Sequence, residues 1–338
     1  MKKKRVWIIF AVSLAVLLPA SVYVMENFLD TKTGFYSDGG VKAGILSACT
    51  AAAAIIMAVL AYADSAESRY QPSSSTAAAA FCAFTGVFIV VQSVSAFAGQ
   101  SGFTAGTASY YILSVLGLPT GAVFLVTAYD LASGTQKLAK HPIFALLPSV
   151  WGCMYLIMLF ILYAAVVNSF SSAYNTCTAA LVLLFMFSQA KFFTGVESEG
   201  SRKRIYTFGM PAAFLALING ISACILYFSG KGTPDTLPIG FQMLNILAGA
   251  YIISFLASQK PSGESLAAAD VQSTGGANPG GEVSEAAVLS SPASEADCAE
   301  SAPLPAQGTG DLTESCVKFL SAAYPSSEKF APVQKSPF

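Results

Sequence analysis

Charged side chains are scarce in this sequence. Only 11% of the 338 residues are Asp, Glu, Lys or Arg, whereas ordinary soluble domains carry roughly a quarter. Hydrophobic residues make up 54% and come in long blocks rather than on one face of a periodic pattern. These properties argue against a single soluble core and indicate a protein that crosses a membrane several times.

The residue types on which most catalytic and metal sites depend are missing or isolated. The single histidine, His141, precedes Pro142 in a predicted loop, which excludes bis-His haem ligation and HExxH zinc sites. The chain has no GxSxG, P-loop or Rossmann glycine pattern. None of the seven cysteines stands at CxxC spacing, and cysteines within apolar spans behave as small hydrophobes. We therefore expect no enzyme activity, no cofactor and no metal.

Eight apolar segments are long enough to cross a bilayer, which takes about 20 helical residues. They are Val6–Met25, Val41–Tyr62, Thr76–Ala98, Ala108–Tyr129, Pro142–Val167, Tyr174–Ala190, Ile205–Phe228 and Pro238–Ala257. The first could instead be a signal peptide, but its length and the missing Ala-x-Ala favour an uncleaved helix. The sequence predicts an all-α, polytopic bundle of eight spans over residues 1–257.

Basic residues divide unequally between the two sides of this predicted bundle. With the N-terminus in the cytoplasm, eleven fall in cytoplasmic segments and only Lys32, Lys42 and Lys231 fall in outer loops. This satisfies the positive-inside rule, so we expect an integral protein of a bacterial cytoplasmic membrane with both termini cytoplasmic. The basic residues lie at span ends rather than in a stripe, which indicates no nucleic-acid binding.

From residue 258 to 338 the chain becomes rich in Ser, Ala, Gly, Pro and acidic residues. Such a segment cannot bury enough apolar surface to offset the entropy of ordering it, so we predict a disordered, acidic cytoplasmic tail. Residues 311–323 could form a short helix, because Asp311 and Glu314 have capping-box spacing. This helix would dock on a partner protein or the membrane surface, or form transiently without a role.

The span Ile205–Phe228 is sorted by side-chain size around the helix. One side carries small residues and an amide, namely Gly209, Ala212, Ala213, Ala216, Asn219, Gly220 and Ala223. The other carries Met210, Phe214, Leu217, Ile218, Ile221 and Ile225. Membrane helices associate through small residues and interhelical amides, so we expect the small side to pack against neighbours and the large side to face lipid.

Several polar side chains fall near the predicted midplane of the spans. The candidates for a binding site are Gln92, Ser95, Thr120, Asn219, Gln242 and Asn245. Buried amides need hydrogen-bond partners, so one reading is interhelical bonds worth about 1 kcal/mol each, and the other is a polar pocket for a neutral ligand. Pro119, within the Gly117–Gly121 pair, could kink its helix and free a backbone carbonyl.

Asp64 and Asp130 each end a span after an Ala-Tyr element. The pair Tyr129-Asp130 resembles one half of the motif of intramembrane aspartyl proteases, but the other half, Gly-x-Gly-Asp, is missing from this chain. A carboxylate at a helix C-terminus opposes the helix dipole. We therefore expect an interfacial ion pair, for example with Lys137, or a solvated boundary rather than catalysis.

These observations favour a non-catalytic membrane protein that binds, senses or assembles, with the lipid bilayer as its environment. The alternative is a transporter of an uncharged or hydrophobic solute. Asp, Glu, Lys and Arg are absent from the predicted midplane, where ion-coupled transporters usually place them. A sealed core would favour binding, and a water-filled cavity reaching the midplane would favour transport.

Overall fold

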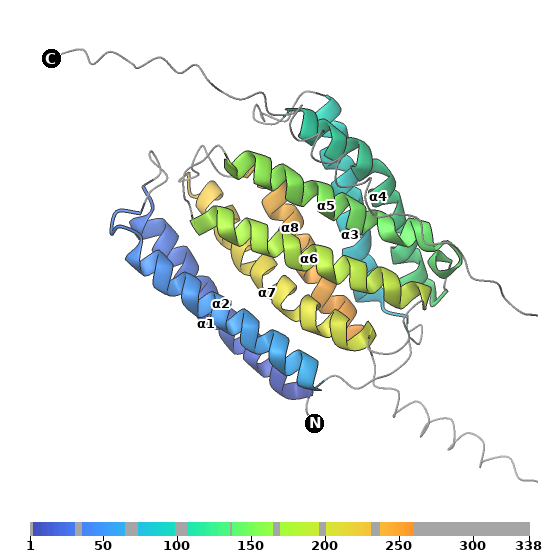
Figure 1. The fold of residues 1–338 in the computed structure, drawn as a ribbon, viewed down its shortest axis with the longest axis horizontal. Helices are drawn as coiled ribbons and strands as arrows, with labels where there is room; N and C mark the ends of the chain where they lie inside the picture. The colour runs from blue at the N-terminus through green and yellow to red at the C-terminus, as the bar shows by residue number, and fades with distance from the viewer. Residues whose placement is uncertain are drawn as a thin grey trace, which may run out of the picture. The chain divides into compact units, whose positions relative to one another are not determined.

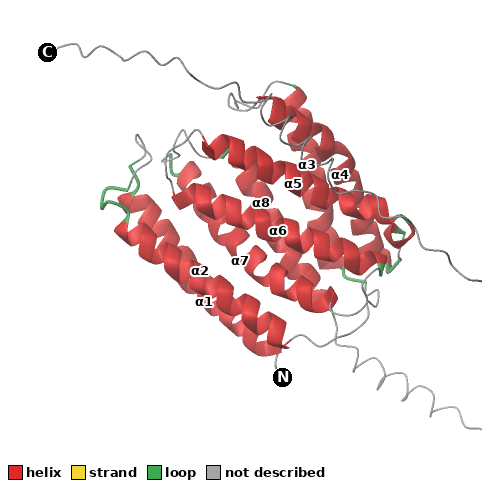
Figure 2. Ribbon diagram, viewed as in Figure 1, coloured by secondary structure: helices red, strands yellow, loops and turns green. Residues whose placement is uncertain are grey.

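A computed structural model describes residues 3–30, 36–64, 74–98, 107–135, 137–164, 170–195, 201–230 and 237–259. Within these ranges the chain is helical (Figures 1 and 2). The helices are α1 (Lys3–Phe28), α2 (Val41–Asp64), α3 (Thr76–Phe97), α4 (Thr107–Ser133), α5 (Pro142–Ala164), α6 (Phe170–Thr194), α7 (Ser201–Phe228) and α8 (Ile239–Ser258), with the short 3-10 helix η1 (Leu138–Lys140) before α5. All eight α-helices are long and apolar enough to span a membrane, which confirms the predicted all-α, multi-pass fold.

The helix ends follow from local sequence. The Asp38 carboxylate accepts hydrogen bonds from the backbone N–H groups of Gly40 and Lys42, each at 3.0 Å, at the start of α2. Ser75 caps α3 through the N–H of Ala78 at 3.3 Å, because a side-chain oxygen satisfies a donor that the first turn leaves free. Gly134 follows α4 with φ of 69°, a left-handed conformation that glycine adopts without a Cβ clash.

Six helices close a ring in which each packs against the next. The order of contacts is α3, α4, α5, α6, α7, α8 and back to α3. Short connections make sequential helices antiparallel neighbours, and the contact between α8 and α3 closes the ring. The hairpin of α1 and α2 lies outside it and packs mainly against α7 (Figure 1).

Close helix packing in the ring depends on glycine. A Cβ added at Gly220 of α7 would lie 2.8 Å from the carbonyl oxygen of Gln242 in α8, and one added at Gly86 of α3 would lie 3.0 Å from that of Gly121 in α4. Small residues let membrane helices approach this closely. The helix α4 continues through Pro119 to Ser133, so this proline does not end it.

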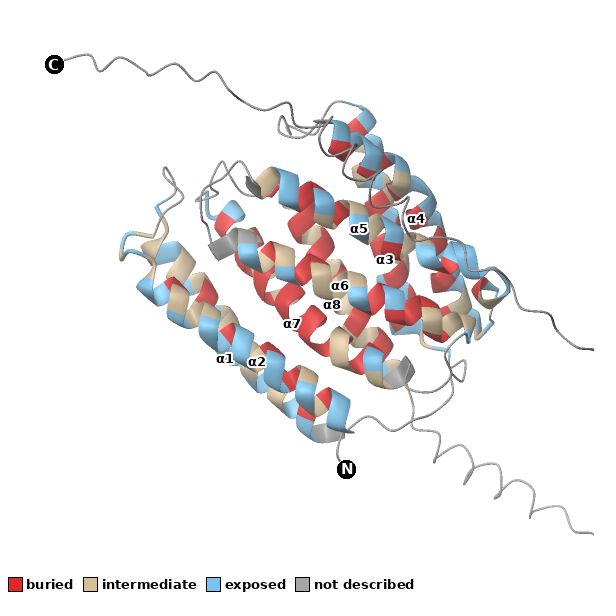
Figure 3. Cartoon of the chain, in the orientation of Figure 1, coloured by how far each residue is buried: buried red, intermediate tan, exposed pale blue. Residues whose placement is uncertain are grey.

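The most deeply buried helix is α7. In its most apolar stretch 78% of the residues are buried, against 11% in α1, and Figure 3 shows this contrast between the two helices. The small side of α7 packs against neighbours as expected. The expectation that its large side faces lipid is wrong: Met210, Phe214 and Ile218 are buried.

The hairpin of α1 and α2 is the reason for this burial. Phe10 of α1 contacts Phe214 edge-on, with ring centroids 6.1 Å apart, and the Ser222 hydroxyl of α7 donates to that of Ser21 in α1 at 3.2 Å. Only toward the end of α7 does a large side chain on this face open outward, since Ile225 is 40% exposed. The small and large sides of α7 therefore face two different protein interfaces, the ring and the outer hairpin, rather than protein and lipid.

Aromatic side chains fill the middle of the ring. Tyr155 of α5 stacks on Trp151 and on Phe241 of α8, with centroids 5.5 and 5.3 Å apart. Further along α8, Tyr251 contacts Phe124 of α4 and Phe185 of α6 edge-on. Such pairs contribute about 0.5–1.5 kcal/mol beyond the area that they bury, so α8 is fixed to the surrounding helices.

The predicted tail over 258–338, including the short helix at 311–323, lies outside the described residues from position 260 onward. Its disorder and its cytoplasmic side stay predictions.

Candidate functional site

Amide side chains from three consecutive helices meet inside the ring. Asn219 of α7 donates a hydrogen bond to the side-chain oxygen of Asn175 in α6. The same oxygen accepts from Gln242 of α8 at 3.5 Å, and Asn245 donates to the Gln242 oxygen at 3.4 Å. The Asn175 amide in turn donates to the hydroxyl of Tyr163 in α5 at 2.6 Å. We call these five residues the amide cluster.

The amide cluster contains three of the six predicted site residues. Asn219, Gln242 and Asn245 belong to it and are buried. The expected interhelical partner of Asn219 is thus an amide on α6. Asn175 and Tyr163 were not among the predicted residues, because both stand near the ends of their helices, where a polar side chain usually indicates a membrane boundary. The burial of Asn175 identifies it only once the fold is known.

The other three predicted residues lie apart from this network. Gln92 of α3 donates to the hydroxyl of Tyr110 in α4 at 3.4 Å and lies against Gly240 in the first turn of α8. The hydroxyls of Ser95 and Thr120 donate to carbonyls of their own helices, Gln92 at 2.8 Å and Leu116 at 2.7 Å. Such bonds satisfy a hydroxyl locally, so neither residue joins the cluster.

The amide cluster lies toward one end of the bundle. Tyr163 is one residue from the end of α5, Asn175 is five residues into α6, and Gln242 is three residues into α8. At 1.5 Å per residue, the nine residues from Asn219 to the end of α7 correspond to about 13 Å. This is close to half of a hydrocarbon core of about 30 Å, so Asn219 lies deeper than Tyr163 and Gln242, and the midplane position of these amides stays a prediction. The positive-inside distribution predicts that this end of the bundle is the outer end.

The amide cluster has hydrogen-bonding capacity beyond the bonds between its members. Each amide nitrogen carries two N–H donors and each amide oxygen two lone pairs. In the observed network every amide nitrogen makes one bond, and two of the four amide oxygens, those of Asn175 and Gln242, accept one or more. The group carries no charge, so it suits donors and acceptors of a neutral molecule.

An additional polar atom with no partner lies in the same part of the ring. The hydroxyl of Tyr155 on α5 is buried without a hydrogen-bond partner among the described residues. Its ring stacks on Phe241, the residue immediately before Gln242. A buried hydroxyl left without a bond costs about 1–3 kcal/mol, so a water or a ligand hydrogen-bonded to Tyr155 would stabilise this end of the bundle.

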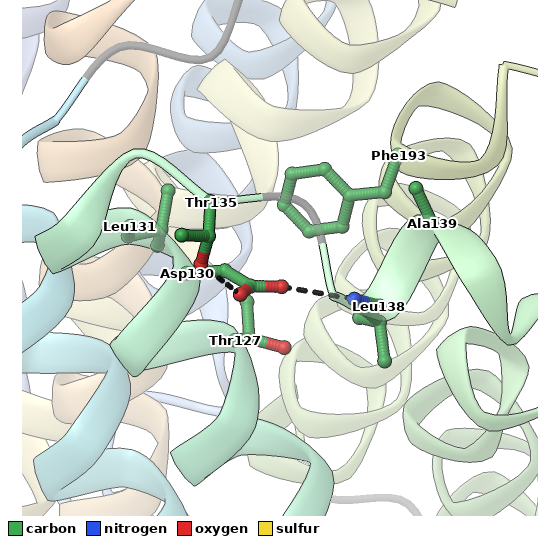
Figure 4. A pocket seen from close by; sticks show the side chains of 7 residues that line it. All are labelled: Thr127, Asp130, Leu131, Thr135, Leu138, Ala139 and Phe193. Carbon is green, nitrogen blue, oxygen red and sulfur yellow. Dashed lines mark hydrogen bonds between the residues drawn. The ribbon is translucent and has the colours of Figure 1, made fainter.

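At the opposite end, Asp130 closes the turn after α4. Its carboxylate accepts from the Thr135 hydroxyl at 2.7 Å and from the backbone N–H of Leu138 at 2.9 Å (Figure 4). The expected ion pair with Lys137 does not form, because the Lys137 ammonium lies 4.2 Å from the centre of the Tyr129 ring. Asp130 therefore holds the connection to η1. The side chain of Asp64 lies outside the described residues, so a pairing of the two carboxylates stays untested.

The cleft beside Asp130 is narrow and mostly apolar. Thr127, Leu131, Thr135, Ala139 and Phe193 line it together with Asp130 and Leu138 (Figure 4). A second cavity shares Thr127, Leu138 and Phe193 and reaches Gln189 and Tyr251, whose side chains hydrogen-bond to each other. The ring thus has polar groups at both ends and aromatic side chains between them.

In comparisons with known proteins, no family model, no curated protein and no solved structure matches the chain.

Proposed function

We propose that this multi-pass membrane protein is a non-catalytic binding or sensing protein and that the amide cluster is its ligand site. The ligand enters from the end of the bundle at which α5 ends and α6 begins. It is uncharged and carries both hydrogen-bond donors and acceptors. The observation that carries this proposal is the convergence of Asn175, Asn219, Gln242 and Asn245 from three helices.

The absence of charge from the amide cluster limits the class of ligand. An ion transferred into this site would lose its hydration without gaining a counter-charge, which costs several kcal/mol or more. Neutral amide, hydroxyl or carbonyl groups lose much less hydration free energy, and hydrogen bonds to the cluster compensate for that loss. A site built to hydrogen-bond its ligand also discriminates strongly against analogues that lack the matching group.

Ligand binding at the cluster would couple four helices. Its members lie on α5, α6, α7 and α8, so a molecule bonded to several of them favours the arrangement in which these helices are close together. A ligand shifts a conformational equilibrium by its difference in affinity for the two states. This coupling supports a sensing role, and the aromatic side chains that fill the middle of the ring support binding over passage.

Matched neutral and charged probes test the proposal. Purified protein is heated in detergent with increasing acetamide or with the same concentrations of sodium acetate, which has a similar shape but is charged. Acetamide should raise the unfolding temperature, because a ligand at one hundred times its Kd stabilises by about 2.7 kcal/mol. Acetate should not. Equal effects of the two probes would contradict an uncharged site.

Two variants locate the effect. Asn219→Leu keeps the branching of the side chain at Cγ but removes the central amide of the cluster, so the stabilisation by acetamide should disappear. Thr120→Val removes a buried hydroxyl that bonds within α4 and should leave the stabilisation unchanged. A response that survives Asn219→Leu would place binding elsewhere.

Transport of an uncharged solute is the second candidate. Prolines within α4, α5 and α7, namely Pro119, Pro148 and Pro211, favour it, because proline frees a backbone carbonyl and permits bending in membrane helices. Protein reconstituted in vesicles would then accelerate the equilibration of radiolabelled acetamide or glycerol. If the protein only binds, the rate should equal that of protein-free vesicles.

A further inference from the structure

The outermost helix, α1, carries an apolar groove of about 490 Å³. Its larger lining side chains are Trp7, Phe10, Leu14 and Leu18, which recur every three or four residues and therefore lie along one side of the helix. Ala11 and Ala15 lie beside them and are exposed. Small side chains between large ones leave a channel along the helix.

The groove extends over only part of the membrane. It runs from Trp7 to Pro19, and twelve residues at 1.5 Å each give a length of about 18 Å. Half of a hydrocarbon core of about 30 Å is about 15 Å. The groove therefore has the length of one lipid acyl chain. A partner helix crossing the bilayer would contact α1 along its whole length, whereas this groove ends at Pro19.

Basic residues lie at the end of α1 where the groove begins. Arg5 is exposed, and Lys3 and Lys4 precede it in the first turn. The contacts of Phe10 with Phe214 and of Ser21 with Ser222 show that α1 and α7 run parallel. The basic residues at the start of α7, Lys203 and Arg204, therefore lie at the same membrane surface.

The start of α1 is also suited to an anion for a second reason. Its first turn contains no acidic residue, although acidic residues there stabilise a helix and basic ones oppose its dipole. The free N–H groups of a first turn bind phosphate oxygens, and a phosphate would compensate the repulsion between the dipole and the basic side chains. Trp7 lies two residues further in, at the level where tryptophan contacts lipid headgroups.

We propose that this groove binds one acyl chain of an anionic phospholipid whose phosphate lies at Arg5, in the first turn of α1. The lipid belongs to the leaflet in which α1 begins, which the charge distribution predicts to be cytoplasmic. Bound there, the chain lies beside the α1 and α7 contact that covers Phe214 and helps to hold the outer hairpin on the ring. This site is independent of the amide cluster.

Tryptophan fluorescence tests the proposal directly, because the chain has only two tryptophans, Trp7 and Trp151. The full-length Trp151→Phe protein is reconstituted in phosphatidylcholine vesicles in which one lipid in ten has brominated acyl chains, which quench nearby tryptophans. The brominated lipid is either phosphatidylglycerol or phosphatidylcholine. Brominated phosphatidylglycerol should quench Trp7 more strongly, with a relative binding constant at least five-fold higher.

Two substitutions separate the headgroup from the chain. Arg5→Gln should lower the preference for phosphatidylglycerol about five-fold, the factor that corresponds to roughly 1 kcal/mol for each basic residue near an anionic surface. Ala15→Phe fills the groove and should lower the quenching of Trp7 by phosphatidylglycerol to the level of phosphatidylcholine.

A reporter on the lipid-facing side of the same helix provides the control. Val16 is 62% exposed and does not line the groove. In a Trp7→Phe, Trp151→Phe, Val16→Trp protein the two brominated lipids should quench equally, because this position contacts bulk lipid.

Equal quenching of Trp7 by the two lipids would overturn the proposal. A second result would also overturn it: both brominated lipids quench Trp7 ten times less than the Val16→Trp reporter, and cross-linking captures a dimer. A second copy of the chain would then occupy the groove.

Discussion

Replacing Gly220 by alanine tests the close contact between α7 and α8 in the ring. The added Cβ would lie 2.7 Å from the Ile246 side chain and 2.8 Å from the backbone carbonyl oxygen of Gln242. An ordinary contact begins near 3.4 Å, so the α8 backbone would have to move by about 0.6 Å (3.4 minus 2.8). A carbonyl within a helix cannot rotate away as a side chain can, so the whole of α8 must shift.

The control for this substitution is Gly152→Ala in α5. There the nearest atom to the added Cβ would be the end of the Leu183 side chain, at 3.2 Å, which can move by a few tenths of an ångström, and the Leu183 Cα would lie at an ordinary contact distance of 3.7 Å. Both substitutions gain the same helix propensity, roughly 1 kcal/mol. The difference between them therefore isolates the cost of the close approach, which is about 1–3 kcal/mol for overpacking.

The two variants can be compared by unfolding in mixed detergent micelles with increasing sodium dodecyl sulfate. Gly220→Ala should be less stable than Gly152→Ala by about 1–3 kcal/mol. It should also weaken the acetamide response, because the obstructing carbonyl belongs to Gln242 of the amide cluster. If Gly220→Ala were as stable as Gly152→Ala, the contact between α7 and α8 would be looser than described and the geometry of the cluster would be wrong.

Three further predictions follow from particular contacts. Phe214→Ala should cost about 3–5 kcal/mol, as the side chain is fully buried beneath α1, while Ile225→Ala should cost less; equal costs in the same unfolding assay would refute the burial of this face. Asn175→Leu and Asn219→Leu should each destabilise by about 1–3 kcal/mol, and the double variant by less than their sum, since they share a bond; strict additivity would contradict the network. Hydrogen bonds from the backbone N–H of Lys42, above all, and of Gly40 lower the pKa of Asp38 despite the opposing effect of burial. The contribution of the Asp38 carboxylate to the stability of the protein is therefore present above the unfolded pKa of about 3.9 and is lost as the pH falls through the lower pKa of the folded state. Unfolding of Asp38→Asn should therefore depend less on pH below about 4 than that of the natural protein, and identical pH profiles would count against the cap.

The sequence predicted the eight spans because each is a long apolar block with polar or basic residues at its ends. It also predicted that Asn219 bonds to another helix, since a buried amide in a span has few alternatives. It could not predict that the large face of α7 is buried against other helices rather than exposed to lipid. Periodicity shows that a helix has two faces, but lipid and a second apolar helix are equivalent environments in this respect.

The amide cluster was only half predictable for a related reason. Gln242 and Asn245 share a helix face and stand inside a span, so the sequence identifies them. Asn175 stands at the beginning of its span, where a polar residue normally contacts the interface, and its burial depends on the ends of α5 and α8 covering it. Ser95 and Thr120 were indistinguishable from cluster members in sequence, because a hydroxyl that bonds within its own helix leaves no signal there.

Single cysteines in a background without the seven natural ones test most directly whether the amide cluster is a ligand site open to the outer end. Intact cells are treated with a small, impermeant thiol reagent, with Ser37→Cys as the outer and Ser262→Cys as the cytoplasmic reference. Gln242→Cys should react, more slowly than Ser37→Cys, and Ser262→Cys should not. Acetamide, at the concentration that stabilises the natural protein, should slow the reaction at Gln242→Cys and leave that at Ser37→Cys unchanged. A Gln242→Cys that never reacts from outside, or that reacts at the same rate with acetamide present, would contradict the site.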